Sequence, residues 1–424
     1  MKEGEDPINR LKSRTLLAGM VLVVTACGGT ADQPPATGDT APTTAAGPTT
    51  VAPDTTAPAT TAGEKPAVVI GLITDLTGRF VSFGKDIELA TNLAVEQVNE
   101  EGGINGSLVE VQIADTGGEP DQAVISYRDL ADRGVFAISG PLSSGEAEVL
   151  FPQAPEVQVP LITGTANKEG ITDPGQGWAF RNTATNTALY TVAMPAWAEA
   201  YGVETAVLVF DEEEPVTAAA AMFSIPGVAP NVGVEIVNAD APITFTSGQT
   251  DFSTTVQRIT EVEADGLIIM SAPAEAGLIA RELVRQGEVR PVLGHPAQAG
   301  NTFFEQGGSD INDWVLPSIL DPVSGAPATA DYVAMITAAD PEPPTVPEAA
   351  NYFDNILLLA QVMRDAGIDG LWEPADARQA IREGLLGVQG FQGVAGEISF
   401  QENGDAVKTV YVNVVLNGEL QPLE

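Results

Sequence analysis

Short apolar runs alternate with amphipathic stretches along most of the chain, beginning near residue 66. Residues 67–73 form an almost continuous apolar run, which predicts a buried strand. The next stretch brings Ile87, Ala90, Ala94 and Val98 to one face of a predicted helix. The same order continues with strands at 108–114, 135–138 and 159–162, with a helix that buries Ala123, Tyr127, Leu130 and Ala131, and with a helix over 145–156.

The alternation starts again after about residue 185, where a helix over 187–201 leads into a strand over 205–210. An Asn403-Gly404 turn between apolar segments predicts a hairpin of 395–400 with 407–416. Strands that alternate with helices predict parallel sheets with helices on both faces, and two such units predict two lobes. The remaining predicted elements are strands at 232–237, 266–270 and 291–293 and a helix over 351–363.

The pattern is different at the start of the chain. Residues 15–27 form an apolar stretch that is too short to span a membrane and is typical of a secretory signal. Cys27, the only cysteine of the chain, directly follows the small residue Ala26, and this resembles the bacterial lipoprotein signal. We expect residues 1–26 to be a lipoprotein signal peptide and Cys27 to be lipidated. An ordinary signal peptide with a chance cysteine, or a buried free thiol, is the alternative.

Residues 28–63 consist almost wholly of Thr, Ala, Pro, Gly and Asp, without Leu, Ile or an aromatic residue. Such a segment cannot bury a core, so we expect residues 27–65 to be a disordered tether between the lipid and the folded body. The body is then extracytoplasmic, periplasmic or on the cell surface. It folds without a disulfide, because one cysteine cannot form one.

The formal net charge is −39, from 58 acidic and 19 basic residues. Phosphate recognition needs clustered Lys and Arg, so the composition argues against a nucleic-acid partner. An anionic membrane would also repel the chain, so that membrane attachment must come from the lipid. The acidity itself favours solubility outside the cell.

Three polar loops follow successive strands of the first unit, at 74–84, 139–145 and 163–168. In open parallel sheets, ligands bind beyond the carboxyl ends of the strands, where helix N-termini present free N–H groups. The Gly, Ser and Thr of these loops supply hydroxyl groups and allow a close backbone approach. Ser144 lies where a helix N-cap is expected, so a purely structural capping role is the alternative for it.

Residues 94–106, with the sequence Ala-Val-Glu-Gln-Val-Asn-Glu-Glu-Gly-Gly-Ile-Asn-Gly, resemble a helix-to-strand junction of the leucine/isoleucine/valine-binding family. These are type I periplasmic substrate-binding proteins of branched-chain amino acid ABC importers. The resemblance covers roughly residues 66–424, with supporting matches at 76–78, 84, 140–144, 160–163, 166–167, 250–253, 400–405 and 411.

The resemblance implies an α/β fold of two doubly wound parallel-sheet lobes, joined by a three-crossover hinge that closes around the ligand. Lobe 1 would comprise residues 66–184 and about 312–390, and lobe 2 residues 185–311 and about 391–424. Ser144 would give its hydroxyl and N–H to a ligand carboxylate, and Thr165 would contribute backbone groups. Carried over by position, the ligand-binding residues are Phe83, Ser143, Ser144, Thr165, Ala166 and Asn167.

The second unit departs from the family pattern. The family commonly has a tyrosine near the position of Pro215, and it places an acid for the ligand's ammonium group near 294–298, where this chain has none. Asp211 or Glu212 is a substitute, although an acidic run at a helix start is typically a solvated cluster. His295, the only histidine, is a candidate hydrogen-bond donor in the cleft, with a structural role as the alternative.

The sequence argues against an enzyme. One histidine and one cysteine do not support Cys–His chemistry or a His-rich metal site, and no Gly-x-Ser-x-Gly motif is present. We expect no catalytic residue, metal or cofactor. The expected protein is a monomeric, lipid-anchored component of an ABC importer that captures a small polar solute, an amino acid, amide or organic acid, for a membrane permease. A sensor of the same fold is the alternative, and a carboxylate-based hydrolase is a further one.

Overall fold

The computed structural model describes residues 65–321, 325–341 and 345–423. The predicted signal peptide, Cys27 and all but the last residue of the predicted tether lie outside the described residues. Within the described part of the chain, no helix combines the length and the apolar character that crossing a membrane requires.

The first lobe is built on a parallel sheet with the order β2-β1-β3-β4-β5. Successive side chains of a strand point to opposite faces, so the apolar run of β1 buries residues on both. Ile70 and Leu72 face a core shared with α1 and α12, whereas Ile73 faces α2 and α3. The elements are β1 (Val68–Thr74), α1 (Val81–Glu100), β2 (Val109–Asp115), α2 (Pro120–Asp132), β3 (Ala137–Ser139), α3 (Ser144–Leu150), α4 (Ala154–Val157), β4 (Leu161–Thr163) and β5 (Ala179–Arg181).

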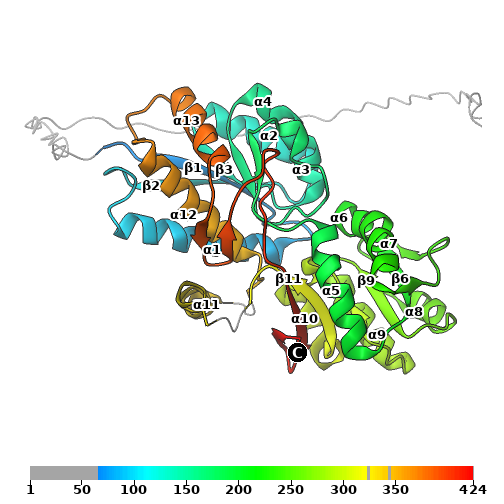
Figure 1. Ribbon diagram of the computed structural model, residues 1–424. Coiled ribbons are helices and arrows are strands. Elements are labelled where there is room, and N and C mark those ends of the chain that lie inside the picture. The colour runs from blue at the N-terminus through cyan, green and yellow to red at the C-terminus, as the bar shows by residue number, and fades with distance from the viewer. Residues whose placement is uncertain (1–64, 322–324, 342–344, 424) are drawn as a thin grey trace, which may run out of the picture. The chain divides into compact units, whose positions relative to one another are not determined.

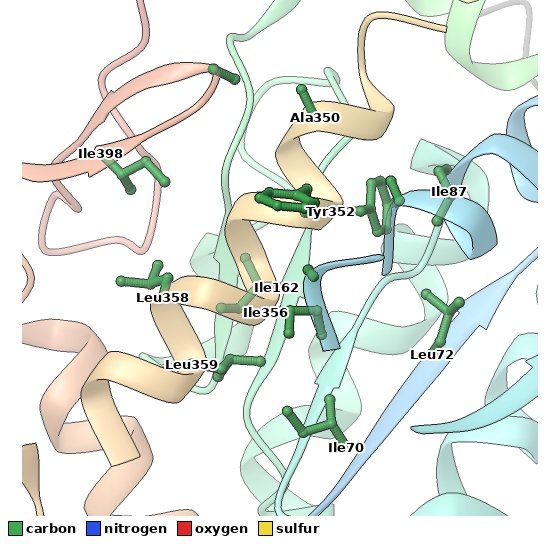
Figure 2. Packing of buried hydrophobic residues seen from close by; sticks show 14 of the residues in the cluster. Ile70, Leu72, Ile87, Ile162, Ala350, Tyr352, Ile356, Leu358, Leu359 and Ile398 are labelled. Carbon is green, nitrogen blue, oxygen red and sulfur yellow. The ribbon is translucent and has the colours of Figure 1, made fainter. Parts of the chain in front are cut away.

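Helix α12 (Ala349–Asp365) covers the centre of this sheet and packs beside α1 (Figure 1). Tyr352, Ile356 and Leu359 project from it among the sheet residues Ile70 and Ile162 (Figure 2). This helix begins 186 residues after β4 ends, at residue 349 against residue 163. Helices α11 (Pro327–Ala339) and α13 (Pro374–Leu386) contribute to the same core.

The second lobe contains a sheet with the order β15-β14-β11-β10-β9-β6-β7, in which β8 also pairs with β6. The strands are parallel except for β14 and β15, which are antiparallel to their neighbours. Helices α5 and α7 cover one face and α8, α9 and α10 the other. The strands are β6 (Thr205–Asp211), β7 (Glu235–Ile236), β8 (Ile243–Phe245), β9 (Gly266–Met270), β10 (Val292–Leu293), β11 (Trp314–Ser318), β14 (Tyr411–Leu416) and β15 (Glu419–Pro422). The helices are α5 (Asn186–Tyr201), α6 (Pro215–Ala219), α7 (Ile225–Val228), α8 (Ser253–Thr260), α9 (Pro273–Gln286) and α10 (Asn301–Gly307).

The chain crosses between the lobes three times, after β5, after β11 and between β13 and β14. Two stretches differ from the expected lobe boundaries. Strand β11 pairs with β10 in the second sheet, so the second crossing comes after Ser318 and not near 312. The small hairpin of β12 (Phe391–Gly393) and β13 (Gly396–Ile398) still packs on the core of the first lobe.

The predicted hairpin of 395–400 with 407–416 is wrong. Strand β13 pairs with β12, and β14 pairs with β11 and β15. The Asn403-Gly404 turn does form, but it closes only the isolated bridge between Phe400 and Ala406. Gly404 O accepts a hydrogen bond from Arg181 N at 2.9 Å, so the turn lies against the end of β5. The chain crosses to the second lobe after this turn. Long-range pairing therefore overrides the local turn signal here.

The glycine-rich motif at 102–106 is a structural feature of the first lobe. A Cβ atom on Gly103, which has a φ of +73°, would lie 2.1 Å from Ser107 O. Asn105 Nδ2 donates to Ile368 O at 2.7 Å, and Arg364 Nε donates to Gly103 O at 3.1 Å. The motif thus attaches the end of α12 to the turn that leads into β2.

Candidate ligand-binding site

A cavity lies at the carboxyl ends of β1, β3 and β4, between the two lobes. The space inside it is small, about 20 Å³, which holds about one water molecule, so a larger solute enters only when the walls move apart. Most of its wall is apolar, and the polar groups are few, as is typical of small-molecule sites. The lining residues are Phe80, Phe83, Leu142, Ser143, Thr165, Asn167, Val216, Pro296, Ala297 and Glu348.

The first loop brings two aromatic rings to the cavity. Asp75, directly after β1, accepts a hydrogen bond from Thr77 N at 3.2 Å through Oδ1 and another from Phe80 N at 2.9 Å through Oδ2. These bonds fold the loop back on itself before α1 begins. Phe80 and Phe83 then meet edge to face, with ring centroids 6.3 Å apart. Phe83 lines the cavity, and its contact with a ligand stays a prediction.

The second loop presents Ser143, and not Ser144, as the N-cap of α3. Ser143 Oγ accepts from Glu146 N at 3.2 Å and Ser143 N donates to Glu146 Oε2 at 2.8 Å, which is a capping box. Ser143 Oγ also donates to Glu146 Oε2 at 2.8 Å. Ser144 is the first helical residue, is fully buried, and accepts a hydrogen bond from Lys168 N at 3.3 Å. The expected capping position is therefore shifted by one residue. Ser143 lines the cavity, whereas Ser144 does not.

Glu146, beneath Ser143, is buried. Burial raises the pKa of its carboxyl group, and the hydrogen bonds from Thr116 and Ser143 oppose that rise. The hydroxyl hydrogen of Ser143 is bonded to Glu146. The hydroxyl can therefore donate to a ligand only if it first gives up this bond.

The third loop supplies Thr165 and Asn167. Thr165 Oγ1 lies 2.9 Å from Tyr352 Oη and donates to Leu142 O. Asn167 Nδ2 donates to Ala184 O at 2.7 Å. The backbone N–H groups of Thr165 and Ala166 both donate to Thr163 Oγ1, at 3.3 and 3.1 Å. Ala166 is buried and does not line the cavity.

A buried ion pair holds this third loop in place. Arg181 Nη2 lies 2.7 Å from Asp405 Oδ2, and Arg181 Nη1 donates to Lys168 O at 2.5 Å. Asp405 Oδ1 also accepts from Thr172 Oγ1 at 2.8 Å. The turn at 401–405, from the end of the chain, thus braces a loop of the cavity.

Asp211 does not line the cavity, which corrects its predicted role as the acid for a ligand. It is fully buried, and its Oδ2 accepts from Arg79 Nη2 at 2.9 Å and from Ser247 Oγ at 2.8 Å. Arg79 belongs to the first lobe and also pairs with Glu275 Oε1 at 3.3 Å. The acid is therefore used in an ion-pair cluster that links the two lobes. Glu212 is exposed and likewise does not line the cavity.

His295 is a structural residue of the loop beside the cavity. Its Nδ1 accepts from Ala297 N at 3.0 Å, which leaves the proton on Nε2 for Asn186 Oδ1 at 3.1 Å. Burial lowers the pKa of His295 to about 3, so the ring is neutral at ordinary pH. Its neighbours Pro296 and Ala297 line the cavity instead.

Glu348 is the site residue that the sequence did not indicate. It immediately precedes α12 and is 4% exposed, and its side chain makes no capping hydrogen bond. Its Oε2 has no hydrogen-bond partner among the described residues. Burial raises the pKa of its carboxyl group to about 8. An acid before a helix is usually a partner of the helix dipole, so its sequence position alone gave no reason to select it.

The lining has the chemistry for a small solute with one apolar part and one polar part. The aromatic and aliphatic wall suits an alkyl group, while Ser143, Thr165, Asn167 and Glu348 suit polar and charged groups. Two α/β lobes, three crossings of the chain and a cavity between the lobes define a two-lobed solute-binding protein.

The chain belongs to the periplasmic binding protein family, because the family model described as periplasmic binding protein matches residues 67–419. It is 27% identical over 338 residues to the Leu/Ile/Val-binding protein BraC3 of Rhizobium johnstonii, covering 80% of this chain and 88% of the relative. It is 22% identical over 342 residues to the leucine-, isoleucine-, valine-, threonine-, and alanine-binding protein of Pseudomonas aeruginosa, covering 80% and 87%.

Solved structures agree on the fold. The branched-chain amino acid transporter substrate binding protein LivJ of Streptococcus pneumoniae, in complex with isoleucine, superposes with a TM-score of 0.74 at 24% identity, covering 84% of this chain and 97% of that chain. The leucine binding protein LivK of Thermotoga maritima gives a TM-score of 0.74 at 23% identity, with the same coverage. The predicted family and fold class are thereby confirmed.

Proposed function

We propose that this protein is the extracytoplasmic, lipid-anchored solute-binding component of an ABC importer, and that it captures an aliphatic amino acid between its lobes for delivery to a membrane permease. The observation that carries the proposal is the cavity between the lobes, whose apolar wall is combined with one carboxylate and three neutral polar side chains. The relatives are named as binding leucine, isoleucine and valine, and these names support the choice of solute.

Binding follows from the two-lobed geometry. The first lobe supplies most of the wall and all of the polar lining groups, while the second lobe supplies Val216, Pro296 and Ala297. A solute that contacts both sides stabilises the closed arrangement by its differential contacts, which is a population shift. No bond is made or broken, so recognition depends on shape, hydrogen bonds and charge.

The test is calorimetric titration of the purified chain with leucine, isoleucine and valine, with glutamate and lysine as controls. We expect saturable binding of the aliphatic amino acids and at least tenfold weaker binding of the charged ones, because a second charge would be buried against the apolar wall. Absence of binding to all three aliphatic amino acids contradicts the proposed solute class.

The anchor is tested separately in cells. We expect Cys27→Ser to move the protein from the membrane fraction to the soluble extracytoplasmic fraction without changing its affinity for the solute, because one thiol carries the lipid in this proposal. Unchanged membrane retention of Cys27→Ser contradicts lipid attachment at this residue.

A further inference from the structure

Among the described residues that line the cavity, Glu348 is the only acid or base. We infer that Glu348, at the start of α12 in the first lobe, is the anionic partner of the ammonium group of an amino acid held in this cavity. The inference rests on the proposed function and names the residue that makes an amino group necessary for recognition.

The geometry leaves one carboxylate oxygen for a ligand. Glu348 occupies the N-cap position of α12, yet its side chain does not cap the helix. Its Oε2 is inaccessible to solvent and lacks a hydrogen-bond partner among the described residues, and the residue is only 4% exposed. A buried oxygen without a partner is costly, and an ammonium group in the cavity would remove that cost.

The other lining groups cannot supply this charge. The second-lobe residues Val216, Pro296 and Ala297 are apolar, and Asp211 and Glu275 are occupied by Arg79. In this chain the acid therefore comes from the first lobe, and not from the segment at 294–298 of the second. Ser143, Thr165 and Asn167 lie on the loops after β3 and β4 and line the same cavity. Their donor hydrogens are bonded to Glu146, Leu142 O and Ala184 O, so each changes partner before it binds the carboxylate of the solute.

The charged groups around the cavity leave Glu348 as the one that responds to the ligand. Asp86 of α1 accepts from Val346 N at 2.8 Å, Glu146 of α3 is bonded to Ser143 and Thr116, and Arg79 is paired with Asp211. Tyr352 Oη is bonded to Thr165 and to Pro141 O. Because burial raises the pKa of Glu348 to about 8, an ammonium group would favour loss of its proton near neutral pH.

The test compares isoleucine with its deaminated analogue 3-methylpentanoate on the full chain. We expect Glu348→Gln to weaken isoleucine binding about 10- to 100-fold, the scale of a lost charged hydrogen bond, and to leave 3-methylpentanoate binding unchanged or tighter. Glu156→Gln, at an exposed acid of α4, is the matched control and should change neither affinity. Retained isoleucine affinity in Glu348→Gln, or an equal loss for both ligands, overturns the inference.

A measurement on the wild-type chain covers the case in which Glu348→Gln does not fold. Calorimetry at pH 6.5 in buffers of different ionisation enthalpy should show that isoleucine binding releases up to one proton. Proton uptake, or none exchanged, overturns the inference while leaving the proposed function intact. If the wild-type chain binds no aliphatic amino acid, the proposed function fails first and the inference with it.

Discussion

Glu348 lines the cavity and also contributes to the pH dependence of stability. Its carboxyl group has a pKa raised from 4.5 to about 8 by burial. Between these two values the folded state binds more protons at this residue than the unfolded state does. Stability therefore falls as pH rises through this window, by at most about 1.4 kcal/mol per pH unit from this group.

We predict that Glu348→Gln removes this part of the pH dependence. The variant should be more stable than the wild-type chain at pH 8.5 and similar to it near pH 4.5, because the neutral amide does not have to lose a proton. Urea unfolding of both chains at pH 4.5, 6.5 and 8.5 gives the comparison. Parallel pH curves for the two chains would show that Glu348 is not the titrating group.

His295 changes stability with pH in the opposite direction to Glu348. Its pKa is lowered from 6.5 to about 3, so the unfolded state binds more protons between these values. The stability that depends on the neutral ring is complete above pH 6.5 and is lost as pH falls toward 3. The two contributions cancel between about pH 4.5 and 6.5, so together they favour a stability maximum in this mildly acidic range.

At the scale of elements, the motif at 102–106 separates structural from ligand-binding signals. It is the most specific resemblance in the sequence, but it lies at the turn before β2, at the opposite end of the sheet from the cavity. Its role is to hold the end of α12 through Asn105 and Gly103. Family membership and ligand identity therefore rest on different residues.

We predict that Gly103→Ala destabilises the protein by about 1–3 kcal/mol, because the new Cβ atom would overlap Ser107 O in a left-handed backbone conformation. Gly102→Ala is the matched control, since its φ is +98° but no atom lies within 4 Å of the added Cβ. It should cost less than Gly103→Ala. Urea unfolding of the two variants measures the difference, and equal losses would show that the close approach is unimportant.

The apolar patterns predicted most elements because both sheets are buried on both faces and their strands are nearly continuous apolar runs. The helix faces of α1 and α2 were found for the same reason, as buried Ile87 and Tyr127 show. The prediction of a hairpin over 395–416 was wrong, since its second segment pairs with β11, about 95 residues earlier in the chain. No local signal carries such a long-range choice.

The cavity was predicted in part. The loops after β1, β3 and β4 were located because parallel strands bring their carboxyl ends to one edge, and Phe83, Ser143, Thr165 and Asn167 meet there. Glu348 was missed because α12 returns to this edge only after the chain has built most of the second lobe. The burial and orientation of Ser144 also depend on a one-residue shift of the helix start that sequence patterns do not resolve.

At the scale of the whole molecule, Arg79 links the lobes beside the cavity. It donates to Asp211 Oδ2 at 2.9 Å and to Ser247 Oγ at 2.7 Å, and it pairs with Glu275 at 3.3 Å. These partners belong to the second lobe, so the bonds exist only when the lobes are close together. The ion pairs add to the stability of that arrangement without touching a solute.

We predict that Arg79→Gln shifts the protein toward open forms and weakens isoleucine binding about three- to tenfold, because closing then gains fewer charged contacts. Small-angle scattering should show a larger radius of gyration for the ligand-free variant, and saturating isoleucine should restore the compact form. Arg133→Gln, which removes an exposed pair with Asp129 on α2, is the control with the same charge change. Identical scattering and affinity in the wild-type chain and Arg79→Gln would show that the Arg79 ion pairs do not hold the lobes together.

The chain enters the first lobe at the end of β1 that is opposite the cavity. Lys65, just ahead of β1, is fastened by its Nζ to Asn105 O and to Asp369 Oδ2, each at 2.7 Å. The seven residues of β1, about 20 Å of strand, separate that point from the loops of the cavity. If the chain is anchored upstream of Lys65, as proposed, the attachment acts on the side of the lobe opposite the cavity and leaves the mouth of the site accessible.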